Sequence, residues 1–335
     1  MKPGPLNLIT DVDGILVGQA EDHHVRTGVT AIVPGERVTA AADVRGGAPG
    51  TRETGTLHVA SLVDAVDAVV LSGGSVFGLD AASGAVERLA EEGRGFPTSA
   101  GRVPVVPAAI LFDLSNGGDK AWGRHSPYSN LGYRAVEAAA HRFDLGNTGA
   151  GLGASAGPLK GGTGSASAVT GGGLQVGAIV AVNAVGSTVI PGTSTLWAAL
   201  FEQAGEMGMP PRSLPAGPLD LDDHLRGFAA ENTTIGVVAT NARLDKGALN
   251  RMAIMAHDGL ARAIRPVHTP FDGDTMFALA TAKHPDTIDA ATLARLGSMA
   301  SDCVTRATGR AMVAAETLDG MTSYSDWRIG KCQQH

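Results

Sequence analysis

Glycine occupies 46 of the 335 positions, and this excess constrains the fold more than any other feature of the chain. The glycines follow no G-X-Y period and no excess of proline accompanies them, which excludes a collagen-like or linker-like chain. Hydrophobic residues reach 44%, too many for a disordered protein. Glycine costs conformational entropy on folding, so an excess of it marks places where backbone turns tightly or approaches other backbone closely. We therefore expect a compact protein with closely packed backbone.

Short apolar runs alternate with stretches of helical periodicity along the chain. The helical stretches cover residues 75–89, 246–264 and 293–307. The runs expected to form buried strands are 67–71, 107–112, 176–182, 235–239 and 276–280. This mixture predicts an α/β or α+β fold whose apolar strands are covered on both faces. The proline-containing range 205–231 is typical of a loop or linker between a long amino-terminal part and a shorter carboxy-terminal part.

Charge and cysteine content limit the partners and the compartment. The formal net charge of −7 argues against duplex nucleic acid as a partner. Cys303 and Cys332 are the two cysteines, too few for a disulfide framework or a cysteine-rich metal site. Residues 1–20 lack the features of a signal peptide, and no apolar run is long enough to cross a bilayer. We expect a soluble, cytoplasmic protein with no membrane partner.

Three further patterns do not support a site. Residues 153–157 match the G-x-S-x-G nucleophile motif, but Pro158 and the glycines that follow disfavour the helix that this motif requires. The turn 71–78 lies between a strand and a helix, yet it has neither dinucleotide-binding nor P-loop spacing. The ten histidines include no H-E-x-x-H pair. We therefore expect no metal and no cofactor.

Two segments in the last third of the chain carry stronger signals. Asp272 and Asp274 flank a glycine directly before an apolar strand, which predicts two carboxylates at the mouth of that strand. Carboxylates so close raise each other's pKa unless a cation or hydrogen-bond donors stabilise them, and a plain polar turn is the alternative interpretation. Asn232-Thr233-Thr234 is either a glycosylation sequon, which the missing secretory signal does not support, or a self-cleavage junction that frees Thr233. A freed threonine can use its own α-amine, with a pKa of about 7.7–8.0, as the base for its hydroxyl.

Several segments resemble one protein family. The segments are Asn232-Thr233-Thr234-Ile235, Ala239-Thr240-Asn241, Arg265-Pro266-Val267-His268-Thr269 and Asp272-Gly273-Asp274-Thr275, with 43–48, 71–74 and 149–151 upstream. They resemble the nylon-oligomer hydrolase branch of the P1 peptidase family, which includes the L-aminopeptidase/D-esterases and β-peptidyl aminopeptidases. The resemblance covers about residues 7–315. It implies an N-terminal-nucleophile hydrolase with a four-layer αββα sandwich. It also implies a single catalytic domain over residues 1–335, which cuts itself into an α chain of residues 1–232 and a β chain of residues 233–335.

The resemblance also implies roles for individual residues. By position, Thr233 would be the nucleophile, released by cleavage after Asn232, and Asn183 would stabilise the oxyanion. Asp272 and Asp274 would orient the amine or hydroxyl of Thr233. The charge of Lys160 would keep that amine neutral and the two carboxylates ionised.

One departure from the family concerns the second oxyanion donor. Family members often carry a tyrosine in the stretch that corresponds to residues 115–120, and this chain has none there. Three possibilities stay open at this point: Asn116 is the donor, a backbone N–H of the same loop is the donor, or the donor is absent. Tyr128 and Tyr133 are the nearest tyrosines.

The expected activity is hydrolysis of amide bonds in peptides or aminohexanoate-type oligomers through an acyl-enzyme, without a cofactor. The family implies a homo-oligomer, a tetramer of αβ units. Two alternatives remain: acyl transfer of the ornithine acetyltransferase kind, and an uncleaved, non-catalytic binding protein of the same fold.

Overall fold

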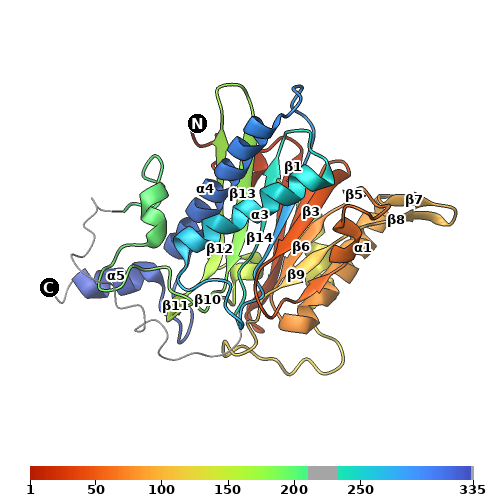
Figure 1. The fold of residues 1–335 in the computed structure, drawn as a ribbon. Coiled ribbons are helices and arrows are strands. Elements are labelled where there is room, and N and C mark those ends of the chain that lie inside the picture. Colours follow the sequence, from red (N-terminus) through yellow and green to blue (C-terminus); the bar gives the residue numbers. More distant parts are fainter. Residues whose placement is uncertain (210–231, 333–335) are drawn as a thin grey trace.

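The computed structural model describes residues 1–209 and 232–332 and contains two β-sheets that face each other (Figure 1). The first sheet has the order β12 (Gly162–Val169), β13 (Gln175–Val182), β14 (Ile235–Thr240), β15 (Thr275–Ala280), β3 (Val38–Val44) and β5 (Ala65–Val66). The second has the order β1 (Ile15–Asp22), β2 (Thr27–Pro34), β6 (Val69–Ser72), β9 (Ala108–Ile110) and β4 (Thr51–Arg52). Two short hairpins stand apart from them: β7 (Phe96–Thr98) with β8 (Gly101–Val103), and β10 (Ser155–Ala156) with β11 (Leu159–Lys160).

Helices cover the outer face of each sheet. α3 (Lys246–Ala263) and α4 (Ala290–Ala314) lie over the first sheet, as Figure 1 shows, and α1 (Ala81–Glu91) and α2 (Tyr128–Glu137) lie over the second. α5 (Tyr324–Cys332) follows α4. The short 3-10 helices are η1 (Ile9–Asp11), η2 (Thr54–Leu57), η3 (Ser75–Asp80), η4 (Gly149–Gly151) and η5 (Trp197–Phe201).

Three apolar layers hold these four layers of secondary structure together. In β14, Val237 and Ala239 point into the layer between the sheets, whereas Val238 packs under α3 and α4. This alternation follows from the two-residue period of a strand. The third layer lies between the second sheet and α1 and α2. The four-layer αββα arrangement follows from this packing.

The predicted buried strands and helical stretches are confirmed. They correspond to β6, β9, β13, β14 and β15, to α3 and α4, and to η3 followed by α1. The predicted linker 205–231 lies outside the described residues from position 210 onward. Within residues 1–209 and 232–332, none of the helices has the length and apolar character needed to cross a membrane.

Strands β1, β2, β3 and β12 were not predicted, and β12 shows the physical reason. Six of its eight residues are glycine, serine or alanine, none of which is among the residue types enriched in strands. Helix α4 packs directly on its backbone: a Cβ atom at Gly164 would lie 2.0 Å from the Ala307 carbonyl oxygen. The strand is therefore defined by contact with a helix far along the chain, and no local pattern records that contact.

Candidate active site

Four of the predicted site residues, Asn183, Thr233, Asp272 and Asp274, meet at one end of the central strands of the first sheet. β13 ends at Val182 and pairs antiparallel with β14, so its last residues lie beside the beginning of β14. β14 and β15 are parallel, so their first residues also lie side by side, with Ile235 opposite Thr275. A bridge between Asn232 and Asp272 extends that parallel pairing past the strand ends. The fold thereby gathers Asn183, Thr233 and the Asp-Gly-Asp turn.

The Thr233 side chain is buried, with 4% of the residue exposed, and its polar atoms have defined partners. Its Oγ1 hydroxyl donates to the Asn232 carbonyl oxygen at 2.5 Å and accepts the Gly273 N–H at 3.0 Å. Its backbone N–H donates to the Asn183 carbonyl oxygen at 2.6 Å. A Cβ atom at Gly273 would lie 2.8 Å from Oγ1, so only glycine leaves room for the hydroxyl there. The hydroxyl thus points at the peptide bond predicted to be cut.

The two carboxylates lie next to Thr233 but hold backbone N–H groups of the flanking chain. Asp274 accepts from the Thr234 N–H at 2.7 Å through one oxygen and from His268 through the other. Asp272 accepts from the Thr269 N–H at 2.8 Å and from the Val185 N–H at 3.4 Å. These donors are the stabilising groups that two adjacent carboxylates require.

The two carboxyl groups also affect each other. Both side chains are buried. Burial raises the pKa of Asp272, and the neighbouring charge of Asp274 raises it further. Asp272 therefore takes up a proton more readily than an ordinary aspartate.

Asn183 connects both sheets to Thr233. Its side-chain oxygen accepts the Ser155 N–H, and its Nδ2 donates to the Phe112 carbonyl oxygen, each at 2.9 Å. An amide nitrogen carries two hydrogens, so Nδ2 has one further donor beyond the bond to Phe112. The backbone oxygen of Asn183 holds the Thr233 nitrogen, a contact that the sequence analysis did not predict.

Lys160 is fully buried in β11, which pairs with β10 beside Asn183. Its Nζ donates to the carbonyl oxygens of Gly151 at 3.0 Å and Gly161 at 2.8 Å. Burial lowers the pKa of Lys160 to about 7, and the charge of Asp113 opposes this shift. The carboxylate that acts on Lys160 in the described structure is therefore Asp113, on the second sheet's side, rather than the Asp-Gly-Asp pair.

The residues weighed as a second oxyanion donor make no hydrogen bond with Thr233 in the described structure. The Asn116 amide donates to the carbonyl oxygens of Arg26 at 2.6 Å and Gly153 at 3.3 Å, and none of its hydrogen bonds in the described chain reaches Thr233 or Asn183. Tyr128 is fully buried in α2 against Gly74, and burial raises the pKa of its hydroxyl. Tyr133 donates to Glu91 at the surface.

The residues that sequence reasoning missed are Gly273, for its N–H group, and His268. Both lie inside segments that carried the family resemblance, but nothing in their spacing shows what they contact. Gly46 packs closely on the same turn, since a Cβ atom there would lie 2.2 Å from the Asp272 carbonyl oxygen. Among the residues that the structure describes, no group of three or more His, Cys, Asp or Glu side chains could hold a metal ion.

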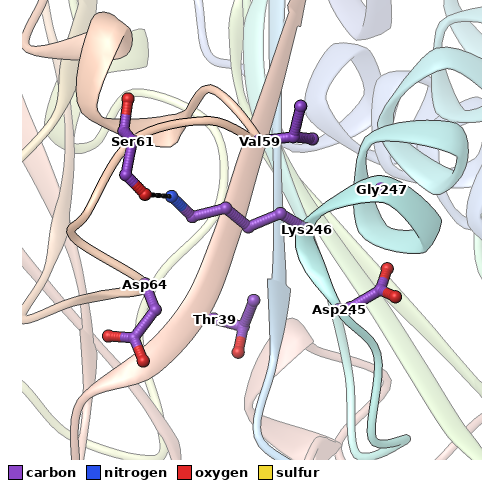
Figure 2. Close-up of a pocket in the computed structure, with 7 residues that line it drawn as sticks. All are labelled: Thr39, Val59, Ser61, Asp64, Asp245, Lys246 and Gly247. Atoms are coloured by element: carbon purple, nitrogen blue, oxygen red, sulfur yellow. Dashed lines mark hydrogen bonds between the residues drawn. The ribbon is translucent and has the colours of Figure 1, made fainter.

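A surface pocket of about 540 Å³ lies at the other end of the strands of the first sheet, away from Thr233. Figure 2 shows Lys246 reaching across it to the Ser61 carbonyl oxygen, at 3.2 Å. The other lining residues are Thr39, Val59, Asp64, Asp245 and Gly247. Thr39 pairs with Ala280 at the end of β15, whereas the Asp-Gly-Asp turn precedes the beginning of β15. The pocket is therefore separate from the Thr233 site.

Comparison with known proteins finds relatives over nearly the whole chain. Residues 7–325 match peptidase family S58. A protein of Mycobacterium tuberculosis named an uncharacterized aminopeptidase is 43% identical over 346 residues, which covers 96% of this chain and 98% of the relative. A 6-aminohexanoate-oligomer endohydrolase of Paenarthrobacter ureafaciens is 30% identical over 322 residues, which covers 92% of this chain and 82% of the relative.

Solved structures share the architecture. The L-aminopeptidase D-Ala-esterase/amidase of Ochrobactrum anthropi, described as a variant of the Ntn-hydrolase fold, superposes with a TM-score of 0.71 at 22% identity, over 99% of this chain and 95% of that one. A Burkholderia β-aminopeptidase gives a TM-score of 0.70, also at 22% identity, over 99% and 95%. The predicted αββα fold of N-terminal-nucleophile type is confirmed.

Proposed function

The chain belongs to peptidase family S58, as the sequence predicted, and from this premise we propose that it is an N-terminal threonine hydrolase made active by its own cleavage. The family and the named relatives establish amide hydrolysis as the class of reaction. The proposal adds the cut between Asn232 and Thr233 and the use of the freed Thr233 as nucleophile. The observation that carries it is the 2.5 Å contact between the Thr233 hydroxyl and the Asn232 carbonyl oxygen.

Self-cleavage begins with the Thr233 hydroxyl. Its oxygen attacks the Asn232 carbonyl carbon, the bond from that carbon to the Thr233 nitrogen breaks, and the hydroxyl proton passes to that nitrogen. This leaves an ester on Oγ1 and a free amine. Water then hydrolyses the ester and releases Asn232 as a new carboxyl terminus. The Gly273 N–H, 3.0 Å from Oγ1, helps to hold the hydroxyl for this attack.

The mature site uses the same groups on an external amide. The freed amine stays beside the Asn183 carbonyl oxygen and accepts the hydroxyl proton while Oγ1 attacks the substrate carbonyl carbon. The substrate C–N bond breaks, its nitrogen takes that proton and leaves as an amine, and water then hydrolyses the acyl-enzyme. The second hydrogen of Asn183 Nδ2 is the proposed oxyanion donor, a role typically worth about 10²–10³ in rate. Lys160, with a pKa of about 7, pairs in the β10–β11 hairpin with Ser155, whose N–H donates to the Asn183 side-chain oxygen.

The uncut chain should not hydrolyse external amides. Its nucleophile is buried and its hydroxyl is already hydrogen-bonded to Asn232. Activity should therefore appear in step with the cut.

The substrate class follows from the relatives' names: amides next to a free amino terminus for the aminopeptidase, and internal amides for the oligomer endohydrolase. We propose that the chain hydrolyses amides of one of these kinds, and assays with an amino-acid amide and an aminohexanoate oligomer decide between them. An assay for acetyl transfer to ornithine or glutamate tests the acyl-transfer alternative. The cytoplasmic location and the homo-oligomer of αβ units remain predictions.

Intact mass and turnover of matched variants test the proposal. We expect the wild-type chain to separate into fragments 1–232 and 233–335. Thr233→Val keeps the shape but removes the hydroxyl, so this variant should stay one inactive chain. Thr234→Val is the control, because it makes the same change one residue later and should be cut and active. A wild-type chain that stays uncut yet hydrolyses amides would overturn the proposal.

A further inference from the structure

His268 directs two donors at one oxygen of Asp274. Its backbone N–H lies 3.0 Å from Asp274 Oδ2, and its ring Nδ1 lies 2.7 Å from the same atom. The residue has a φ of +55°, a left-handed conformation that is uncommon for residues other than glycine and that asparagine, aspartate and histidine adopt more readily than most. This backbone turn lets the N–H and the ring of one residue converge on a single carboxylate oxygen.

The other oxygen of Asp274 holds the chain next to the nucleophile. Oδ1 accepts the Thr234 N–H at 2.7 Å, and the Thr275 N–H donates to the Thr234 carbonyl oxygen at 3.3 Å. Once the chain is cut, Thr233 becomes a terminus, and terminal residues fray unless hydrogen bonds tie them down. The Thr234–Asp274 bond is therefore one of the few contacts that can keep the new terminus in register with β15.

A second histidine packs behind the first. The ring of His257 meets that of His268 edge to face, with centroids 4.8 Å apart. His257 Nε2 lies 3.0 Å from the Asp43 carbonyl oxygen and 3.5 Å from its carboxylate, which in turn pairs with Arg45. Burial lowers the pKa of His257 to about 4, so this ring is neutral at neutral pH.

The ionisable groups facing His268 are thereby defined. Asp274 contacts it directly, Asp43 lies beyond the neutral His257, and Asp272 belongs to the same turn as Asp274. The ring nitrogen that faces Asp274 is a donor in either the neutral Nδ1–H form or the imidazolium.

We infer that His268 is a positioning residue for the reaction at Thr233: it aims the Asp274 carboxylate at the Thr234 N–H and so keeps the freed amino terminus in place for attack. The inference rests on the proposed function, because a terminus at Thr233 exists only after the cut. His268 does not touch Thr233 through any hydrogen bond of the described structure, so its effect passes through Asp274.

Two substitutions separate positioning from general damage. Asparagine in His268→Asn tolerates a positive φ and places an amide N–H near the position of Nδ1. Glycine in His268→Gly tolerates the φ and keeps the backbone N–H, but it removes the ring donor. We expect His268→Gly to lower kcat at least about tenfold, because misplacement by about 1 Å can cost about 10² in rate. His268→Asn should restore kcat to within about threefold, with little change of KM in either variant.

The split between kcat and KM is the second readout. An amino terminus that is out of place lowers kcat and kcat/KM together and leaves KM unchanged. If both variants keep the wild-type kcat, or if both lose activity equally, the inference is wrong.

Amide hydrogen exchange tests the positioning without relying on turnover. Exchange within residues 233–240 should be faster in His268→Gly than in the wild type, and close to wild type in His268→Asn. Equal exchange in all three proteins would overturn the inference. If the wild-type chain proves to be uncut, the proposed function fails, while the exchange comparison still decides whether His268 holds Asp274 against Thr234.

Discussion

At the scale of the residue, Lys160 shows how a buried charge ties stability to pH. The side chain is fully buried and is held by the carbonyl oxygens of Gly151 and Gly161. These bonds do not replace the hydration of an ammonium group, so burial lowers its pKa from 10.5 to about 7. The buried lysine therefore lowers the free energy of unfolding at neutral pH. It pairs with Ser155, whose N–H binds the Asn183 side chain, and this position is consistent with a role in the reaction.

The first prediction concerns the pH dependence of unfolding. Between pH 7 and 10.5 the unfolded chain keeps the Lys160 proton that the folded chain has lost, so the unfolding free energy rises with pH. The contribution is about 1.4 kcal/mol for each pH unit in this window. Lys160→Met should abolish that contribution, as measured by urea unfolding from pH 7 to 10 in the uncut Thr233→Val chain.

Lys283→Met is the matched control, because Lys283 is exposed and pairs with Glu36 at the surface. This variant should keep the pH slope of its parent. Equal slopes in the parent and in Lys160→Met would show that Lys160 remains charged in the folded chain.

At the scale of the element, β12 shows what small residues accomplish in this fold. Alternate residues of the strand lie under α4, and at Gly164 a Cβ atom would meet the Ala307 carbonyl oxygen at 2.0 Å and the Ala311 nitrogen at 2.6 Å. The opposing atoms are backbone, which cannot turn aside as a side chain can. The helix is seated against the strand because the strand presents almost no side chain.

The second prediction follows from that contact. Gly164→Ala should push α4 away from β12 and lower the unfolding free energy by at least about 2 kcal/mol, at the upper part of the range for overpacked cores. Gly171→Ala is the control, because an added Cβ there meets nothing within 4 Å. Denaturation midpoints of the two variants give the comparison, and similar midpoints would contradict the close packing of β12 and α4.

The same contact explains which elements sequence reasoning could predict. The apolar strands β13, β14 and β15 and the periodic helices α3 and α4 carry their burial in their own residues, so their patterns predicted them. β12 owes its place to a helix more than 100 residues later, and the register of Thr233 against Gly273 depends on the parallel pairing of β14 with β15. The family resemblance supplied the site residues, whereas the roles of Gly273, His268 and the Asn183 carbonyl oxygen needed the three-dimensional structure.

At the scale of the whole molecule, one buried ion pair joins the two fragments that the proposed cut would create. Arg306 in α4 is fully buried and binds Glu206 through two hydrogen bonds, at 2.5 and 2.8 Å. The same guanidinium binds Asn7 Oδ1 at 2.7 Å and the Ser167 carbonyl oxygen at 2.8 Å. Burial disfavours the charged carboxyl, but the bonds and charge of Arg306 hold the pKa of Glu206 below its ordinary value. The pair thereby attaches Glu206 of the amino-terminal fragment to α4 of the carboxy-terminal fragment.

The last prediction is that this pair keeps the cut enzyme together. Glu206→Gln leaves the Arg306 charge buried without its partner, a change that typically costs about 3–5 kcal/mol. In the cut enzyme no peptide bond joins the fragments, so we expect them to separate at a lower urea concentration, as measured by size-exclusion chromatography. In the uncut Thr233→Val chain the same substitution should destabilise the fold without releasing a fragment.

Since the lowered pKa belongs to the Glu206 carboxyl, the contribution of the ion pair to stability is complete above the ordinary glutamate pKa and is lost as the pH falls through the lower folded value. Glu36→Gln is the matched control, because Glu36 and Lys283 also join the two fragments but lie exposed, where an ion pair contributes about 0–1 kcal/mol. Equal urea midpoints for the Glu206 and Glu36 variants would mean that the apolar core alone, and not this buried pair, holds the fragments together.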